Sequence, residues 1–175
     1  QTAPTESVTN KLNGMTALLD TSLGAVRRIS SDLRPTMLDD LGLNAAVEWL
    51  VEEFQKRHEN LACTLVLDLG DRKIGKEPAI AAYRVVQECL TNVARHADAD
   101  KLHLMLGVRD GRLVISIQDN GRGLSPDKKG GFGLLGMRKR VQALGGSFNL
   151  DSLPGEGVAV DVSLPLARET QEDSA

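Results

Sequence analysis

The stretch VVQECLTNVARHADA, residues 85–99, sets Glu88, Asn92 and His96 four residues apart on a segment that is otherwise largely apolar. A step of four residues advances about 400° around an α-helix, so the three side chains form one slowly drifting stripe. The simplest interpretation is the solvated edge of an amphipathic helix. The alternative is the polar lining of a binding cleft, and the rest of the chain decides between the two.

Helical and strand-like segments alternate around this stretch. Apolar residues at helical spacing predict helices, and alternating or β-branched runs predict strands. The predicted helices cover about residues 8–33, 44–58, 77–97 and 137–144, and the predicted strands cover 61–69, 101–108, 112–119, 147–152 and 157–165. Asn44 is expected to cap the second helix. This order predicts an α+β fold in which one mixed sheet carries its helices on a single face.

The composition suits one ordinary domain with an accessory segment, because 41% of the 175 residues are hydrophobic and 3% are aromatic. A net charge of -3 and a pI of about 5.6 argue against a nucleic-acid partner. Without a signal peptide or an apolar run of about 18 residues, we expect no membrane contact and a cytoplasmic location. Cys63 and Cys89 are expected to be reduced, buried thiols. Because the chain begins at Gln1, we expect a piece of a longer protein.

A glycine-rich stretch, DNGRGLSPDKKGGFGLLGM, covers residues 119–137. Asp119 ends a predicted strand, where a fixed carboxylate can accept a hydrogen bond from an exocyclic amine such as that of adenine. Glycines beside it allow the backbone to approach a flat ligand, and Lys128 can reach negative charge. The glycines before the basic helix leave backbone N–H groups free for phosphates. The alternative is a mobile surface loop. The stretch matches neither a P-loop nor a dinucleotide fingerprint.

Four ordered motifs resemble a known superfamily. QECLTNVARHA, DNGRG, GGFGLLGM and GEGV…LP resemble the N, G1 and G2 boxes and the closing hairpin of GHKL ATP-binding domains, which include gyrase-type ATPases and sensor histidine kinase catalytic domains. SSDLRPTMLDDLGLNAAVEWL resembles the segment before the catalytic domain in the histidine kinases related to nitrate and sugar-phosphate sensors. The resemblance implies a two-layer α/β sandwich with an N-terminal helical arm from a dimerisation hairpin. The implied parts are the arm at 1–40, the ATP-binding catalytic domain at 41–166 and a polar tail at 167–175.

The resemblance also implies roles for single residues. Asn92 would coordinate the Mg²⁺ ion that bridges the ATP phosphates, and Glu88 would orient or deprotonate through a metal-bound water. Both are therefore candidate catalytic residues. His96 would lie near the phosphates, although it could equally be an exposed histidine at a helix end, and Asp119 would recognise the adenine amine. The other implied nucleotide contacts are Gly121, Gly123, Lys128, Gly131, Gly133, Leu134, Gly136 and Val158.

Two features depart from the family pattern. Val158 stands where the family usually has a threonine whose hydroxyl helps to hold the adenine-binding aspartate, so one hydrogen bond to Asp119 is expected to be missing or replaced. The three histidines, His58, His96 and His103, all lack the context of a phospho-accepting histidine. We therefore expect a chain that binds ATP but lacks the acceptor helix.

The expected activity is that of a protein histidine kinase. The γ-phosphoryl group of ATP would pass to a histidine of the dimerisation hairpin and then to a response regulator protein. The expected partners are that regulator and the hairpin of the parent homodimer, which could be anchored in the inner membrane. Two alternatives stay open. One is a nucleotide-binding module that has lost its chemistry. The other is an anti-sigma-type serine kinase, which would lack the LRP…LGL segment.

Overall fold

The computed structural model describes residues 36–70, 72, 74–124 and 132–166. The predicted helix over 8–33, Lys128, Gly131 and the polar tail lie outside the described residues. Residues 37–175 form a unit separate from residues 1–36, and the predicted end of the arm at residue 40 stays a prediction. Within the described ranges, none of the helices has the length and apolar character needed to cross a membrane.

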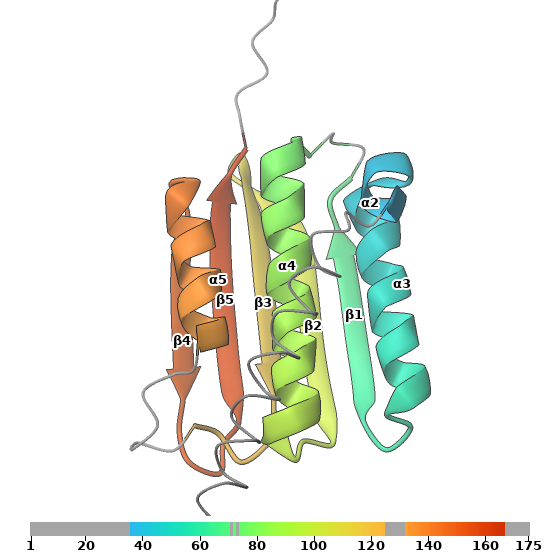
Figure 1. Cartoon of the computed structure of the whole chain (residues 1–175), viewed down its shortest axis with the longest axis vertical. Coiled ribbons are helices and arrows are strands. Elements are labelled where there is room, and N and C mark those ends of the chain that lie inside the picture. Colours follow the sequence, from blue (N-terminus) through green and yellow to red (C-terminus); the bar gives the residue numbers. More distant parts are fainter. Residues whose placement is uncertain (1–35, 71, 73, 125–131, 167–175) are drawn as a thin grey trace, which may run out of the picture. The chain divides into compact units, whose positions relative to one another are not determined.

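Five strands form one sheet in the order β1-β2-β3-β5-β4 (Figure 1). β1 and β2 are parallel, and the other three neighbouring pairs are antiparallel. The strands are β1 Ala62–Asp68, β2 Lys101–Arg109, β3 Arg112–Asp119, β4 Ser147–Ser152 and β5 Val158–Pro165. The predicted mixed sheet is therefore confirmed.

The long helices lie side by side on one face of this sheet (Figure 1). The helices are α2 Thr36–Asp40, α3 Gly42–Arg57, α4 Lys76–Asn92 and α5 Phe132–Ala143, and a π-helical turn, η1 Val93–Ala97, continues α4 directly. No helix of the described residues covers the opposite face. The predicted α+β sandwich with helices on a single face is confirmed.

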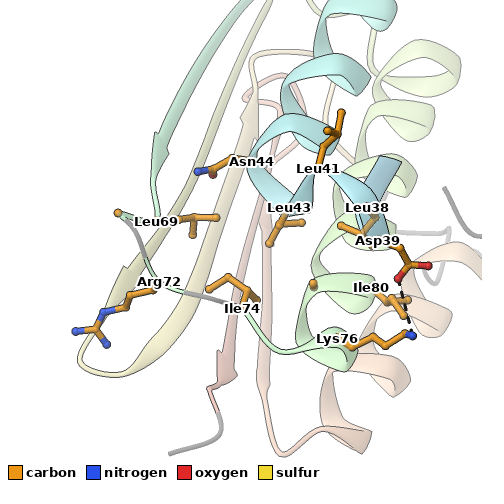
Figure 2. A pocket seen from close by; sticks show the side chains of 13 residues that line it. Leu38, Asp39, Leu41, Leu43, Asn44, Leu69, Arg72, Ile74, Lys76 and Ile80 are labelled. Carbon is orange, nitrogen blue, oxygen red and sulfur yellow. Dashed lines mark ion pairs between the residues drawn. The ribbon is translucent and has the colours of Figure 1, made fainter. Parts of the chain in front are cut away.

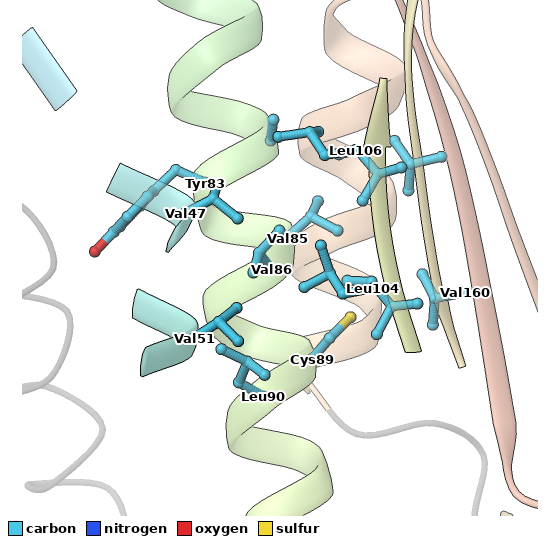
Figure 3. Close-up of a cluster of buried hydrophobic side chains, with 14 of the residues drawn as sticks. Val47, Val51, Tyr83, Val85, Val86, Cys89, Leu90, Leu104, Leu106 and Val160 are labelled. Carbon is cyan, nitrogen blue, oxygen red and sulfur yellow. The ribbon is translucent and has the colours of Figure 1, made fainter. Parts of the chain in front are cut away.

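The core follows from the alternation of side chains along the strands. In β2, Leu102 and Leu104 are buried under the helices while His103 between them is exposed, because successive strand residues point to opposite faces. α4 is the central helix and is buried on several sides, since it packs on the sheet and between α3 and α5 (Figure 3). Val85 and Val86 are fully buried there, and each contributes about 1.5–3 kcal/mol by leaving water.

Two helix starts differ from the prediction. The expected cap at Asn44 is wrong, because α2 ends at Asp40 and α3 already begins at Gly42, so Asn44 lies inside the helix. α5 begins at Phe132, about one turn earlier than its apolar pattern indicates, which places Gly133 inside the helix. Glycine is a poor helix former, and tertiary packing against α4 outweighs that local preference here.

Candidate functional site

Three chain segments meet at the end of the sheet where β3 finishes. The backbone N–H of Arg122 donates to the carbonyl oxygen of Ala97 at 2.7 Å, and the N–H of Gly155 donates to the carbonyl oxygen of Arg122 at 2.8 Å. The first bond satisfies a carbonyl at the end of a helix, a group that has no partner within the helix itself. We call the place formed by η1, residues 119–124 and residues 153–157 the β3 corner.

Asp119 is the one buried charged residue of the described chain, with 7% of its surface exposed. One carboxylate oxygen, Oδ1, accepts the backbone N–H of Gly121 at 2.9 Å. The described residues contain no fully buried side-chain oxygen or nitrogen that lacks a partner. The second oxygen, which has no hydrogen bond there, therefore keeps access to solvent. In the β3 corner, one carboxylate oxygen of Asp119 is therefore held by a hydrogen bond, and the other is available to accept one.

Glycines at the corner make room for neighbouring backbone. A Cβ atom on Gly121 would overlap the carbonyl oxygen of Ala97 and lie 2.7 Å from its carbon. Gly157 in the β4–β5 turn has a φ of +82°, and a Cβ there would lie 2.7 Å from the carbonyl carbon of Asp119. Gly123 packs in the same way against Leu153. The segments therefore approach one another at distances that only glycine allows.

The polar side chains along α4 and η1 become more exposed toward the end of η1. Glu88 and Asn92 are half-buried, and His96 is exposed. The helix widens into the π-helical turn η1 directly after Asn92, which ends the regular four-residue advance. Such turns are rare in proteins, and those that occur are often found at functional sites. Glu88 faces α5, because a Cβ on Gly133 would overlap its carboxylate and lie 2.9 Å from Cδ. The structure therefore brings Glu88 and Gly133 together.

Cys89 is a buried residue of α4 whose thiol is influenced by two acidic residues of the candidate site. Burial, together with the carboxylates of Glu88 and Asp119, raises the pKa of the Cys89 thiol to about 12. Its Sγ is 3.9 Å from Sδ of Met137 on α5. Burial also raises the pKa of the half-buried Cys63, and both cysteines are free thiols. The thiol of Cys89 is therefore a core group that stays protonated at neutral pH.

Asn120 is a corner residue whose role the motif pattern does not reveal. Its Oδ1 accepts the backbone N–H groups of Asp100 and Lys101 at 3.1 and 2.9 Å. Its Nδ2 donates to the carboxylate of Asp100 at 2.6 Å. Asn120 thus fixes the start of β2 to the end of β3, and its side chain is engaged in protein contacts. In the sequence, only the general tendency of asparagine to form turns could have indicated this role of Asn120.

A family of proteins described as histidine kinase-, DNA gyrase B- and HSP90-like ATPases has a sequence profile that matches residues 77–168, more than half of the chain. The chain belongs to this ATPase family. The family predicted from the four motifs is therefore confirmed, and the matched residues of the ATPase domain include every described residue of the β3 corner.

Curated relatives of the ATPase domain are sensor kinases. The signal transduction histidine-protein kinase/phosphatase UhpB of Salmonella typhimurium is 38% identical over 142 residues, which is 81% of this chain and 28% of that protein. DegS of Brevibacillus brevis, with the same description, is 32% identical over 161 residues, 91% of this chain and 42% of that protein. The chain spans less than half the length of these relatives.

Solved structures agree with the fold. A histidine kinase domain from Erythrobacter litoralis EL346 superposes with a TM-score of 0.61 at 26% identity, covering 71% of this chain and 61% of that one. The Acinetobacter baumannii histidine kinase AdeS has the same TM-score at 18% identity, covering 94% and 87% of the two chains, and so shows the fold alone.

The remaining predicted site residues of the ATPase domain differ in burial and in their distance from the β3 corner. Leu134 and Val158 are half-buried and pack against the hydrophobic core. Gly136 faces open space, since a Cβ there would meet nothing within 4 Å. His58 and His103 lie outside the corner: His58 follows α3 and stacks on Phe54, and His103 is on the uncovered face of β2. The described residues contain no cluster of three or more His, Cys, Asp or Glu that could hold a metal.

A separate pocket of about 500 Å³ lies at the other end of α4 (Figure 2). α2, α3 and the start of α4 line it, and an ion pair of 3.9 Å joins Lys76 to Asp39 at its edge. Lys76 begins α4 and Asn92 ends it, which separates the pocket from the β3 corner by about 24 Å along the helix. In the described chain, the fully buried side-chain polar atoms, including any that line the pocket, all have a hydrogen-bond partner.

Proposed function

We propose that this chain is the ATP-binding catalytic domain of a two-component sensor histidine kinase. The observation that carries the proposal is Asp119, a buried carboxylate with one oxygen fixed by Gly121 and the other available. Such an acceptor suits the exocyclic amine of adenine, because a buried hydrogen bond to a charged group is worth about 1.5–3 kcal/mol. The curated relatives, named as histidine kinases, support the same assignment.

The other residues would act on the phosphate end of the nucleotide. Asn92 would offer its amide oxygen to Mg²⁺, and Glu88 one turn earlier would orient the acceptor histidine or take its proton through a water molecule. His96, exposed at the end of η1, would lie near the phosphates. Gly133 keeps the start of α5 close to Glu88. We also propose phosphate contacts for Lys128, Gly131 and Gly136, and contacts with the base for Gly121, Gly123, Leu134 and Val158.

The donors present are compatible with Mg²⁺. This ion prefers oxygen ligands and is usually held by one or two side chains, with substrate phosphates and waters completing its shell. The half-buried Asn92 would supply such an oxygen. When bound, the ion would neutralise the charge of the phosphates. The protein contributes positioning, which is most of the catalysis in phosphoryl transfer.

The acceptor histidine would come from a dimerisation hairpin of the parent protein, and the phosphoryl group would then pass to a response regulator. Both are proposed partners. Because ATP and response regulators are cytoplasmic, we propose that the domain acts in the cytoplasm, whether or not its parent is anchored in a membrane.

The first test is calorimetric titration of the chain with ATP, with and without Mg²⁺. We expect Mg²⁺-dependent binding that is lost in Asp119→Asn and no longer responds to Mg²⁺ in Asn92→Ala. Absence of ATP binding to the unchanged chain would refute the proposal. Adding a hairpin that carries an acceptor histidine then separates the alternatives. Acid-labile labelling of that histidine supports a histidine kinase, acid-stable labelling of serine indicates a serine kinase, and no labelling indicates a binding module.

A further inference from the structure

The hydroxyl group of Ser152 connects two segments of the β3 corner. Ser152 is the last residue of β4 and is half-buried. Its Oγ accepts the backbone N–H of Leu124 at 2.8 Å and donates to the carbonyl oxygen of Gly157 at 2.9 Å. One hydroxyl therefore joins the segment that follows Asp119 to the β4–β5 turn.

Both partners of this hydroxyl act on the position of Asp119. Leu124 follows Asp119 by five positions, so its bond to Ser152 ties the chain just after Asp119 to the end of β4. Gly157 lies against the backbone of Asp119, since a Cβ on Gly157 would overlap the carbonyl oxygen of Asp119 and lie 3.0 Å from Cα of Asn120. Displacement of either partner would therefore move the carboxylate or its backbone support.

The neighbouring side chains offer no substitute for this hydroxyl. Val158 pairs directly with Ser152 across the hairpin and has no polar group. The carboxylate of Asp119 accepts only the N–H of Gly121 among the described residues. Among the described residues, the other hydrogen bond between the β4–β5 turn and residues 119–124 is a backbone bond, from the N–H of Gly155 to the carbonyl oxygen of Arg122. The side-chain contribution to this junction therefore comes from Ser152.

We propose that Ser152 is a positioning residue that holds Asp119 in place for recognition of the adenine amine. This inference rests on the proposed function, because it assumes that Asp119 binds the base. Removal of the hydroxyl would leave a backbone donor and a backbone acceptor unpaired in a half-buried place. Residues 119–124 would then lose their fixed position, and the hydrogen bond between Asp119 and the base would become weaker.

The experiment compares ADP with inosine diphosphate, in which a carbonyl oxygen replaces the adenine amine. Calorimetry would give both dissociation constants for the unchanged chain and for Ser152→Ala, Ser152→Thr and Ser163→Ala. Ser163 is the matched control, because it lies in the same β4–β5 hairpin toward the opposite end of β5, and its hydroxyl accepts a hydrogen bond of 2.6 Å from Nε of Arg112 on β3. Thermal unfolding of each variant would establish the folded fraction.

We expect Ser152→Ala to bind ADP about tenfold more weakly and inosine diphosphate only about twofold more weakly, since the lost contact serves the amine. The ratio of the two constants should therefore fall by about fivefold, whereas partial unfolding would weaken both ligands equally. Ser152→Thr should retain the ratio, and Ser163→Ala should leave it unchanged. An unaltered ratio in Ser152→Ala would overturn this inference alone. Failure of the unchanged chain to bind ADP would overturn the proposed function as well.

Discussion

Replacement of Gly121 by alanine would place a methyl group against the backbone of η1. The added Cβ would overlap the carbonyl oxygen of Ala97 and lie 2.7 Å from its carbonyl carbon and 2.9 Å from its Cβ, where ordinary contact begins at 3.4 Å. The neighbour is backbone at the end of a helix and cannot rotate away as a side chain would. Residues 119–124 must therefore separate from η1 by at least several tenths of an ångström.

The cost of this separation can be worked out from its parts. Overpacking of a tight site costs about 1–3 kcal/mol. The shift would also strain the hydrogen bond from Gly121 to Asp119 and the one from Arg122 to Ala97, each with a net value of about 1 kcal/mol. We expect Gly121→Ala to lower the free energy of unfolding by about 4 kcal/mol, from a total that is about 5–15 kcal/mol for most domains.

Urea unfolding followed by fluorescence of the single tryptophan, Trp49, measures this change. With a slope of about 2 kcal/mol per molar urea, the midpoint should fall by about 2 M. Gly136→Ala is the control, because a Cβ there meets nothing within 4 Å and alanine in a helix adds up to about 1 kcal/mol. A Gly121→Ala midpoint equal to that of the unchanged chain, with ADP binding intact, would refute the reasoning.

Three further predictions concern single residues. Because burial, Glu88 and Asp119 raise the pKa of Cys89 from 9.0 to about 12, the unfolded chain loses this proton at lower pH than the folded chain. Stability should therefore fall above about pH 9 by about 1 kcal/mol per pH unit, and urea unfolding at increasing pH should show a shallower fall for Cys89→Ala. Gly133→Ala should displace the flexible carboxylate of Glu88 without unfolding the domain, lowering transfer to an added acceptor hairpin at least tenfold while calorimetry shows similar ATP affinity. Asn120→Ala should cost about 1–3 kcal/mol in urea unfolding, yet its folded form should bind ADP like the unchanged chain, and a selective loss of binding would make Asn120 a ligand residue.

The elements that could be predicted from the sequence are those in which polar and apolar residues repeat with the period of a helix or a strand. β2 alternates buried and exposed residues, and α4 repeats polar residues every three or four positions beside a buried apolar face, so each pattern identifies its element without knowledge of its neighbours. The same holds for Asp119 at the end of a strand, followed by glycines. These local patterns yield the fold class and the position of the β3 corner.

The remaining features depend on contacts between distant parts of the chain. The hydrogen bonds of Asn120 reach residues 19 and 20 positions away, and the bond between Ser152 and Leu124 spans 28 positions. No local pattern encodes such partners. The early start of α5 has the same origin, because Gly133 becomes helical where it packs against Glu88. The π-helical turn at η1 is likewise invisible to a period of 3.6 residues.

The parallel pairing of β1 has a consequence for the order in which the domain opens. β1 is an edge strand that bonds only to β2, and all of α4 lies between the two strands in the chain, whereas β2 and β3 are joined by a short turn. Parallel pairs are slightly less stable per residue, and contacts between distant residues are slow to form. Backbone amides of β1 should therefore exchange with solvent before those of β3. Since the β3 corner contains no residue of β1 or α3, the proposed nucleotide site can persist while this edge opens and recloses.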